Sequence, residues 1–167
     1  GKAGKIITEE RLKDIFLELQ DQGANNINLV TAGHYVPQVC DALEHAKSSG
    51  LHIPVVYNSS GYEKADTIRM LEGLVDIYLP DFKYFSSYYA QRFSSAPDYY
   101  DVAVEAIEEM VRQTDIPVMD ADGLLRSGTI IRHLMLPGLA GDTAQILRCI
   151  ASHWGSRVLV SLMRQFT

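Results

Sequence analysis

The sequence predicts a parallel α/β fold that forms an arc of a (β/α) barrel and carries a small β-hairpin insertion. Short β-rich apolar runs alternate with amphipathic helical segments along the 167 residues, and this alternation is typical of βαβ units with right-handed crossovers. An open doubly wound sheet shares this alternation, but the predicted strands are evenly spaced and no point is found at which strand order would reverse, which favours the barrel arc. Because a closed eight-stranded barrel takes about 250 residues, five units predict an arc with two open sheet edges.

The predicted elements have local support in the sequence. Thr8 is a good N-cap, Glu9 and Glu10 suit the positive end of a helix dipole, and Gly23 ends this first helix. The other predicted helices cover 36–49, 63–72, 101–113 and 142–154, and the predicted strands cover 28–31, 53–57, 74–79, 129–136 and 157–163.

Two segments interrupt this alternation. Residues 84–100 carry five tyrosines and two phenylalanines, which predicts a partly buried surface helix with a loop; a lid over a substrate or partner is the alternative. Residues 116–127 contain Asp122-Gly123, a hairpin turn signal, between Val118-Met119 and Leu124-Leu125. This second segment is the predicted hairpin.

Composition excludes several classes of protein. Hydrophobic residues make up 47% and charged residues 22%, so the chain is not disordered throughout. No apolar run reaches the roughly 20 residues of a membrane-spanning helix, and a net charge of −6 argues against nucleic acid as a partner. Cys40 and Cys149 form no CxxC pair and are predicted to be small apolar fillers in a reducing, cytoplasmic setting.

The chemistry-bearing residues gather at the predicted strand ends, where parallel α/β folds place their sites. Asp81 and Lys83 are two residues apart and share one face of an extended segment, so they form either a ligand grip or a structural ion pair. Arg132 shares a face with Leu134 and needs an anionic partner, which a ligand carboxylate or Asp81 would supply. His133 is predicted to point the other way, toward the helices.

Two further strand ends carry polar groups. His34 follows a glycine, and a functional and a structural role are equally open for it. Asn58, Ser59 and Ser60 suit hydrogen bonds to a ribose or a carboxylate, or a hard monovalent cation, and a simple Ser-Gly turn is the alternative. The chain has no Walker loop, GxGxxG, GxSxG or HExxH motif.

Five segments, taken together and in order, resemble the radical S-adenosylmethionine superfamily, and within it the uncharacterised iron–sulfur proteins similar to pyruvate formate-lyase activating enzyme. These segments are NLVTAGHYVP at 28–37, VVYNSSGY at 55–62, VDIYLPDFKY at 75–84, IRHLMLPG at 131–138 and VSLMRQFT at 160–167. On this resemblance, residues 1–167 are the C-terminal portion of a partial (β/α) barrel that binds S-adenosylmethionine and a [4Fe–4S] cluster.

The resemblance also implies an activity. An electron, from a donor such as flavodoxin or ferredoxin, passes through the cluster and cleaves S-adenosylmethionine to a 5′-deoxyadenosyl radical. That radical abstracts hydrogen from a substrate, either a glycyl radical enzyme that is thereby activated or a small molecule. Thr31 and its neighbour His34 match the loop that meets the methionine amino group, and Asn58 and Ser60 match the second-strand turn near the cofactor.

The remaining matched positions lie on the later strands. Asp81 and Lys83 match an Asp-x-Lys pair near the cofactor and, in activating enzymes, near a monovalent cation. Arg132 and Leu134 match a segment that contacts the methionine carboxylate and the adenine.

Two departures from the superfamily pattern change what is expected of this chain. Ala32-Gly33-His34 replaces the usual Gly-Gly-Glu, and the CxxxCxxC loop that holds the cluster is absent from the sequence. We therefore expect a fragment that begins just after the cluster loop. Such a fragment is inactive alone, holds no metal, contains no catalytic residue and binds no cofactor tightly. Pairing of two copies through an open sheet edge is left open.

Two other functions remain as alternatives. A decarboxylase or aldolase barrel would use Asp81 and Lys83, although Ser86 stands where such barrels often carry a second acid. A non-catalytic binding module would use the tyrosine-rich segment, and exposure of Tyr88, Tyr89, Tyr99 and Tyr100 without a strand-end pocket would favour it.

Overall fold

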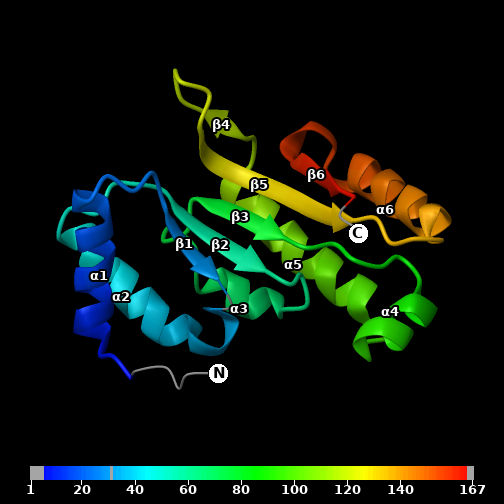
Figure 1. Cartoon of the computed structure of the whole chain (residues 1–167), viewed down its shortest axis with the longest axis horizontal. Coiled ribbons are helices and arrows are strands. Elements are labelled where there is room, and N and C mark those ends of the chain that lie inside the picture. Colours follow the sequence, from blue (N-terminus) through cyan, green and yellow to red (C-terminus); the bar gives the residue numbers. More distant parts are fainter. Residues whose placement is uncertain (1–5, 31, 165–167) are drawn as a thin grey trace.

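A computed structural model of the chain describes residues 6–30 and 32–164 and contains one curved, mostly parallel sheet (Figure 1). Neighbouring strands pair in parallel and in chain order, without reversal or closure into a barrel, as predicted. The parallel strands are β1 (Ile27–Val30), β2 (Val55–Ser59), β3 (Ile77–Pro80), β5 (Leu125–Leu134) and β6 (Leu159–Met163). β4 (Val118–Met119) pairs antiparallel with β5 and forms the predicted hairpin.

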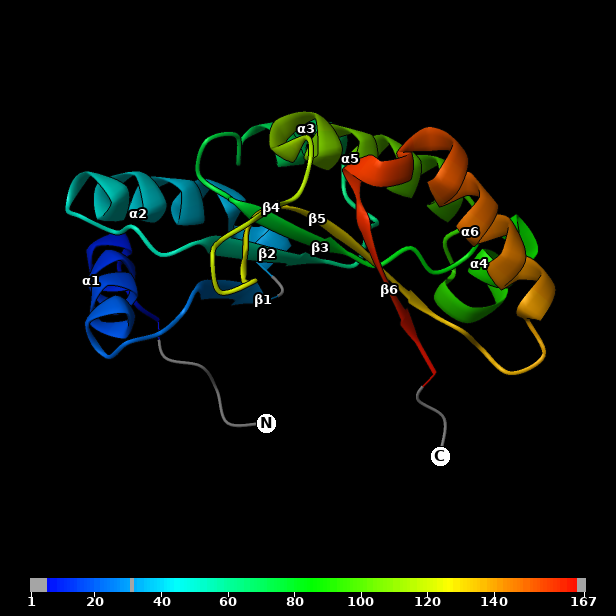
Figure 2. The ribbon, with the colours of Figure 1, turned by 90° about the horizontal axis from the view of Figure 1, so that it is seen from above.

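The helices cover one face of this sheet and leave the other face without a helix in the described part of the chain (Figure 2). α1 packs beside α2 at the β1 edge, and α4 lies near α6 at the other side. The helices are α1 (Glu9–Asp21), α2 (Val36–Ser48), α3 (Ala65–Arg69), α4 (Ser87–Ser94), α5 (Tyr99–Thr114) and α6 (Ala140–His153), with 3₁₀ turns η1 (Ala32–Tyr35) and η2 (Gly155–Arg157). None of the described helices is long and apolar enough to cross a membrane.

Burial alternates along β5 because successive side chains point to opposite faces of a strand. Thr129, Ile131 and His133 are buried against the helices, whereas Arg132 and Leu134 lie half-buried on the open face. His133 binds the carbonyl oxygen of Phe82 through Nδ1 at 2.6 Å and Thr143 Oγ1 through Nε2 at 2.9 Å. The prediction that His133 faces the helices is therefore confirmed.

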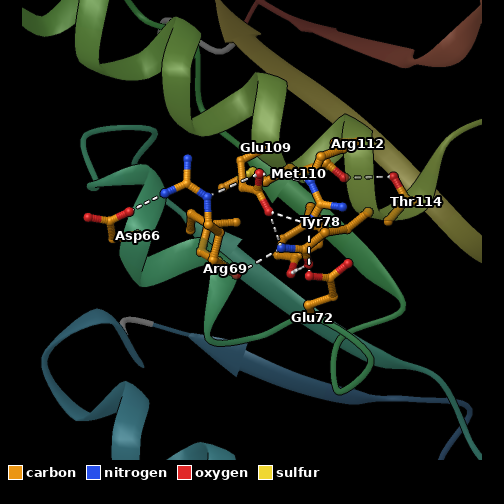
Figure 3. Close-up of polar contacts among 10 residues, drawn as sticks. Asp66, Arg69, Glu72, Tyr78, Glu109, Met110, Arg112 and Thr114 are labelled. Carbon is orange, nitrogen blue, oxygen red and sulfur yellow. Dashed lines mark hydrogen bonds and ion pairs between the residues drawn. The ribbon is translucent and has the colours of Figure 1, made fainter.

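A charged cluster joins α3 to α5 on the helical side (Figure 3). The Glu109 side chain is 6% exposed and accepts from Arg112 at 2.8 and 3.0 Å and from Gln113 at 2.8 Å, while Arg69 approaches to 3.6 Å. Gln113 in turn accepts from the hydroxyl of Tyr78, on β3, at 2.5 Å. Hydrogen bonding from Arg112 holds the pKa of Glu109 below its ordinary value. The cluster ties both helices to the sheet.

Several predicted bounds were wrong for local reasons. The helix predicted at 63–72 is only Ala65–Arg69, followed by turns over residues 70–74 that include Gly73 with φ +77°. The strand predicted at 53–57 starts instead at Val55, because Pro54 has no N–H to donate to a ladder. Residues 84–100 form the partly buried helix and loop that their composition predicts, as α4 and the start of α5.

Candidate functional site

A polar hollow of about 540 Å³ lies at the carboxyl ends of β1, β2, β3 and β5. This is the edge at which parallel α/β folds bind ligands, and the volume lies within the usual range of ligand pockets. The polar residues that line it are His34, Asn58, Ser59, Ser60, Tyr62, Glu63, Lys64, Thr67, Asp81 and Arg132. Six of these ten were singled out from the sequence: His34, Asn58, Ser59, Ser60, Asp81 and Arg132.

Asp81 connects two cations at this edge. Its Oδ1 lies 2.8 Å from Arg132 Nη2, and its Oδ2 lies 3.7 Å from Lys83 Nζ. The backbones of Asp81 and Arg132 also form a parallel bridge. Lys83 and Arg132 therefore reach the same carboxylate, and Asp81 is the anionic partner of Arg132. Among the described residues, the buried Arg132 Nε has no hydrogen-bond partner.

Tyr99 fixes the loops behind Asp81. Its hydroxyl lies 2.9 Å from the carbonyl oxygen of Ser60 and 2.8 Å from that of Asp81, and it accepts the N–H of Lys83 at 3.1 Å. Burial raises the pKa of Tyr99, so its hydroxyl remains a donor. Gly61 has φ +79° and approaches the Asp81 carbonyl so closely that a Cβ there would overlap it. The Tyr99 hydroxyl and the close approach of Gly61 thus hold the end of β2 against the end of β3.

Glu63 lies in the same hollow and was missed from the sequence. Its Oε2 accepts the Tyr57 hydroxyl at 2.7 Å and its Oε1 accepts the Ser59 hydroxyl at 2.5 Å. Ser59 Oγ accepts the N–H of Gly61 at 2.9 Å, which curls the chain after β2 back toward the strand. The signal that could have identified Glu63 is its spacing: an acidic residue four positions after the strand-end Ser59, with Gly61 between them.

The other predicted residues take different positions. Thr31 lies outside the described residues, so its predicted role stays a prediction. His34 lines the hollow from η1 and is exposed, and Asn58 Nδ2 donates to Asn28 Oδ1 at 2.6 Å. Lys83 reaches the site through Asp81, and Leu134 pairs with Met163 farther along β5.

Neither cysteine lies in the hollow. Cys40 is buried on α2, where burial raises the pKa of its thiol, and Cys149 is buried on α6 beside the Tyr100 hydroxyl at 3.2 Å. Burial and this contact raise the pKa of Tyr100 to about 12. Within residues 6–30 and 32–164, no group of three or more His, Cys, Asp or Glu side chains could hold a metal ion.

The tyrosine-rich segment is anchored rather than free. Asp142, in the first turn of α6, accepts the N–H groups of Phe85 and Ser86 at 2.9 Å each. Tyr88 is exposed, whereas Tyr99 is buried and takes part in the strand-end site. The arrangement that would favour a binding module, with exposed tyrosines and no strand-end pocket, is therefore not found in the described residues.

The fold and the hollow define an open β/α arc with a ligand-sized polar site at its strand ends. No protein-family model matches the sequence. A curated relative, the "Uncharacterized protein MJ0674" of Methanocaldococcus jannaschii, is 29% identical over 144 residues, and the match covers 86% of this chain but 38% of that protein. The chain thus spans well under half the length of this relative.

One solved structure that the comparison matches to this chain is a domain of pyruvate-formate lyase-activating enzyme from Bacteroides vulgatus. Its TM-score is 0.47 and its sequence identity 15%, over 81% of this chain and 97% of that domain. At this level of similarity neither protein assigns a function to the chain.

Proposed function

We propose that this chain is the partial-barrel portion of a radical S-adenosylmethionine enzyme and that its strand-end hollow binds S-adenosylmethionine. The observation that carries the proposal is that polar residues of four of the resembling segments meet at one hollow. His34, Asn58, Asp81 and Arg132 come from segments up to about a hundred residues apart and line the same cavity.

The residues of the hollow suit the groups of this ligand. Among residues 6–30 and 32–164 the Arg132 Nε–H has no partner, and a guanidinium suits a carboxylate because it binds carboxylates through parallel N–H groups. Asn58 and Ser60 add amide and hydroxyl groups that suit ribose hydroxyls. S-adenosylmethionine supplies radical chemistry when it is bound in a complete enzyme of this superfamily. The residues of this chain would bind it and orient it.

The residues of the chain do not fit the iron–sulfur cluster. Such clusters are held by cysteine thiolates, and the two cysteines of this sequence are both buried in helices, away from the hollow. A cluster at this site would need thiolates from outside the 167 residues. We therefore assign this chain the binding of the nucleoside ligand and no redox step.

Binding of S-adenosylmethionine to the chain tests this proposal. We expect weak, saturable binding by equilibrium dialysis, which Arg132→Gln weakens by about tenfold or more, the loss expected for a hydrogen bond to a charged group. Arg126→Gln is the matched control because Arg126 is exposed at the opposite end of β5 and lies outside the hollow. The proposal is wrong if the parent chain shows no saturable binding, or if both variants bind equally well.

The decarboxylase or aldolase alternative receives less support. Lys83 is ion-paired with Asp81 at 3.7 Å, and the position where a second acid would stand is Ser86, whose N–H is bound by Asp142. Borohydride trapping of Lys83 with a carbonyl substrate would revive this alternative.

A further inference from the structure

β6 is uncovered on the side where helices cover the rest of the sheet. Val160 and Leu162 pair with Ile131 and His133 of β5, whose side chains are buried against the helices, so all four point to the same side. Val160 and Leu162 are nevertheless 43% and 50% exposed, and no residue of β6 is buried. β6 is apolar at four of its five positions, which is typical of a parallel strand that is covered on both faces. The described residues supply no such cover.

α1 shows the complementary situation at the opposite edge of the arc. Each parallel strand pair of the described sheet is joined by a connection that carries a helix, in the order α2, α3, α5 and α6. α1 precedes β1, and the described sheet offers it no second strand to cover. It continues the layer of helices around the arc beyond α2 (Figure 2). Of its apolar side chains only Phe16 is buried, and Leu19 is 38% exposed. α1 therefore keeps apolar surface for a strand that would lie beside β1.

The two edges of the arc carry opposite charges. After Asp142, in the first turn of α6, the described chain contains three arginines and no acidic residue. Residues 6–26, which contain α1, carry five acidic and two basic side chains. Arg157 shares a groove with acidic residues of α5, whereas the salt bridges of the described residues include neither Arg148 nor Arg164. The β6 edge is therefore positive and the β1 edge negative.

We propose that the β6 edge of one copy of the chain binds the β1 edge of a second copy. β6 pairs in parallel with β1 of the second copy, and α1 of that copy covers Val160 and Leu162. In such a pair the amino ends of both strands lie at the same end of the sheet. α1 leads back to the amino end of β1, so Glu9 and Glu10 at its start lie at the carboxyl end, where Arg164 directly follows β6. Opposite charges thus meet at the carboxyl end of the contact, which favours this pairing over β6 with β6.

Two such contacts close a pair of copies. β1 and β6 both lie toward the open side of the curved sheet (Figure 2), so the β6 edge of each copy meets the β1 edge of the other. A head-to-tail contact that closes gives a finite assembly, and no sheet edge is then left free to pair with other chains. The inference rests on the fold and its charges and is independent of the ligand proposed for the hollow.

Sedimentation equilibrium of the whole chain over a series of concentrations measures this contact. We expect the mass to rise with concentration from the 18.6 kDa of one chain to that of two. Leu162→Glu should weaken the association at least about tenfold, because it removes an apolar contact and places a negative charge against α1. Met70→Glu is the matched control and should leave the association unchanged. Met70 is 49% exposed, as Leu162 is 50%, and it follows α3 in the middle of the arc.

A mixture of two variants tests whether the contact joins different edges. Leu19→Glu alters the β1 edge and Leu162→Glu the β6 edge, so a mixed pair keeps one unaltered contact. We expect the mixture to associate at least about tenfold more tightly than either variant alone, whereas pairing of like edges would give no such recovery. The proposal is overturned by a mass of one chain at every concentration, by equal effects of Leu162→Glu and Met70→Glu, or by a mixture that associates no more tightly than its components.

Discussion

Gly61 offers the sharpest test of how the strand-end site is held together. Its φ of +79° is unfavourable for any residue with a side chain, and a Cβ there would overlap the Asp81 carbonyl oxygen and stand 2.9 Å from the Tyr99 hydroxyl. Gly73 has nearly the same φ, +77°, and a Cβ there meets nothing within 4 Å. Gly61→Ala and Gly73→Ala therefore share the backbone penalty and differ in the clash.

The magnitude follows from these contacts. A left-handed backbone costs an L-residue about 1–2 kcal/mol, which is the whole effect expected for Gly73→Ala. Gly61→Ala adds overpacking against backbone, about 1–3 kcal/mol. Moving the loop away from Asp81 would also disturb the Tyr99 hydrogen bond to Ser60, worth about 1 kcal/mol. We expect Gly61→Ala to lower the free energy of unfolding by about 3–6 kcal/mol, the sum of these contributions.

The assay is urea unfolding followed by far-ultraviolet circular dichroism, with the single Trp154 as a second probe. Coincident transitions for the two probes would justify a two-state free energy. The expected difference between the two variants is at least about 2 kcal/mol, with Gly61→Ala the less stable. Equal stabilities within about 0.5 kcal/mol would refute the close approach of the β2 loop to Asp81.

Three further predictions concern residues that hold the elements together. Tyr99→Phe removes the hydroxyl shared by Ser60, Asp81 and Lys83, and should cost about 1–3 kcal/mol in urea unfolding; an unchanged stability would contradict these contacts. His133→Leu leaves the Phe82 carbonyl and the Thr143 hydroxyl without their partner and should cost about 1–3 kcal/mol, measured in the same way. Because the folded pKa of Glu109 is lowered, its contribution is complete above its unfolded pKa of about 4.3 and is lost as pH falls through the lower folded value. Glu109→Gln should therefore flatten the loss of stability measured as the pH falls below the unfolded pKa of about 4.3, and an unchanged slope would exclude this role.

The faces of the strands could be predicted because one face is buried. A residue's face follows from counting by two along a strand. This count predicted that His133 faces the helices and left Asp81 as one of two candidate partners for Arg132; in the structure His133 contacts Thr143 of α6 and Arg132 contacts Asp81. The parallel order could be predicted for a similar reason, since evenly alternating helices and strands allow few right-handed arrangements. Both inferences use regular, local patterns.

The role of Glu63 could not be predicted because it depends on a loop conformation. The sequence pattern over residues 63–72 predicted a helix. In such a helix Glu63 would lie in the first turn, and its side chain would not be held against β2. In the structure the Ser59 hydroxyl accepts a hydrogen bond from the N–H of Gly61, and the chain bends back toward β2. The helix therefore begins only at Ala65. This bend also needs the space that Gly61 leaves beside Asp81, a contact between positions 20 residues apart.

Asp81 connects the strands whose carboxyl ends carry the hollow. Its N–H donates to the Ser59 carbonyl at 2.9 Å, and the next residue donates to the Arg132 carbonyl at 2.8 Å, so the backbone here is tied to both neighbouring strands. Its side chain holds Arg132, while Ser59 holds Glu63 through its hydroxyl. Arg132 and Glu63 are thus attached to neighbouring points of one hydrogen-bonded ladder. A ligand in the hollow meets groups whose backbone positions are fixed by strand pairing, and such preorganisation lowers the cost of binding.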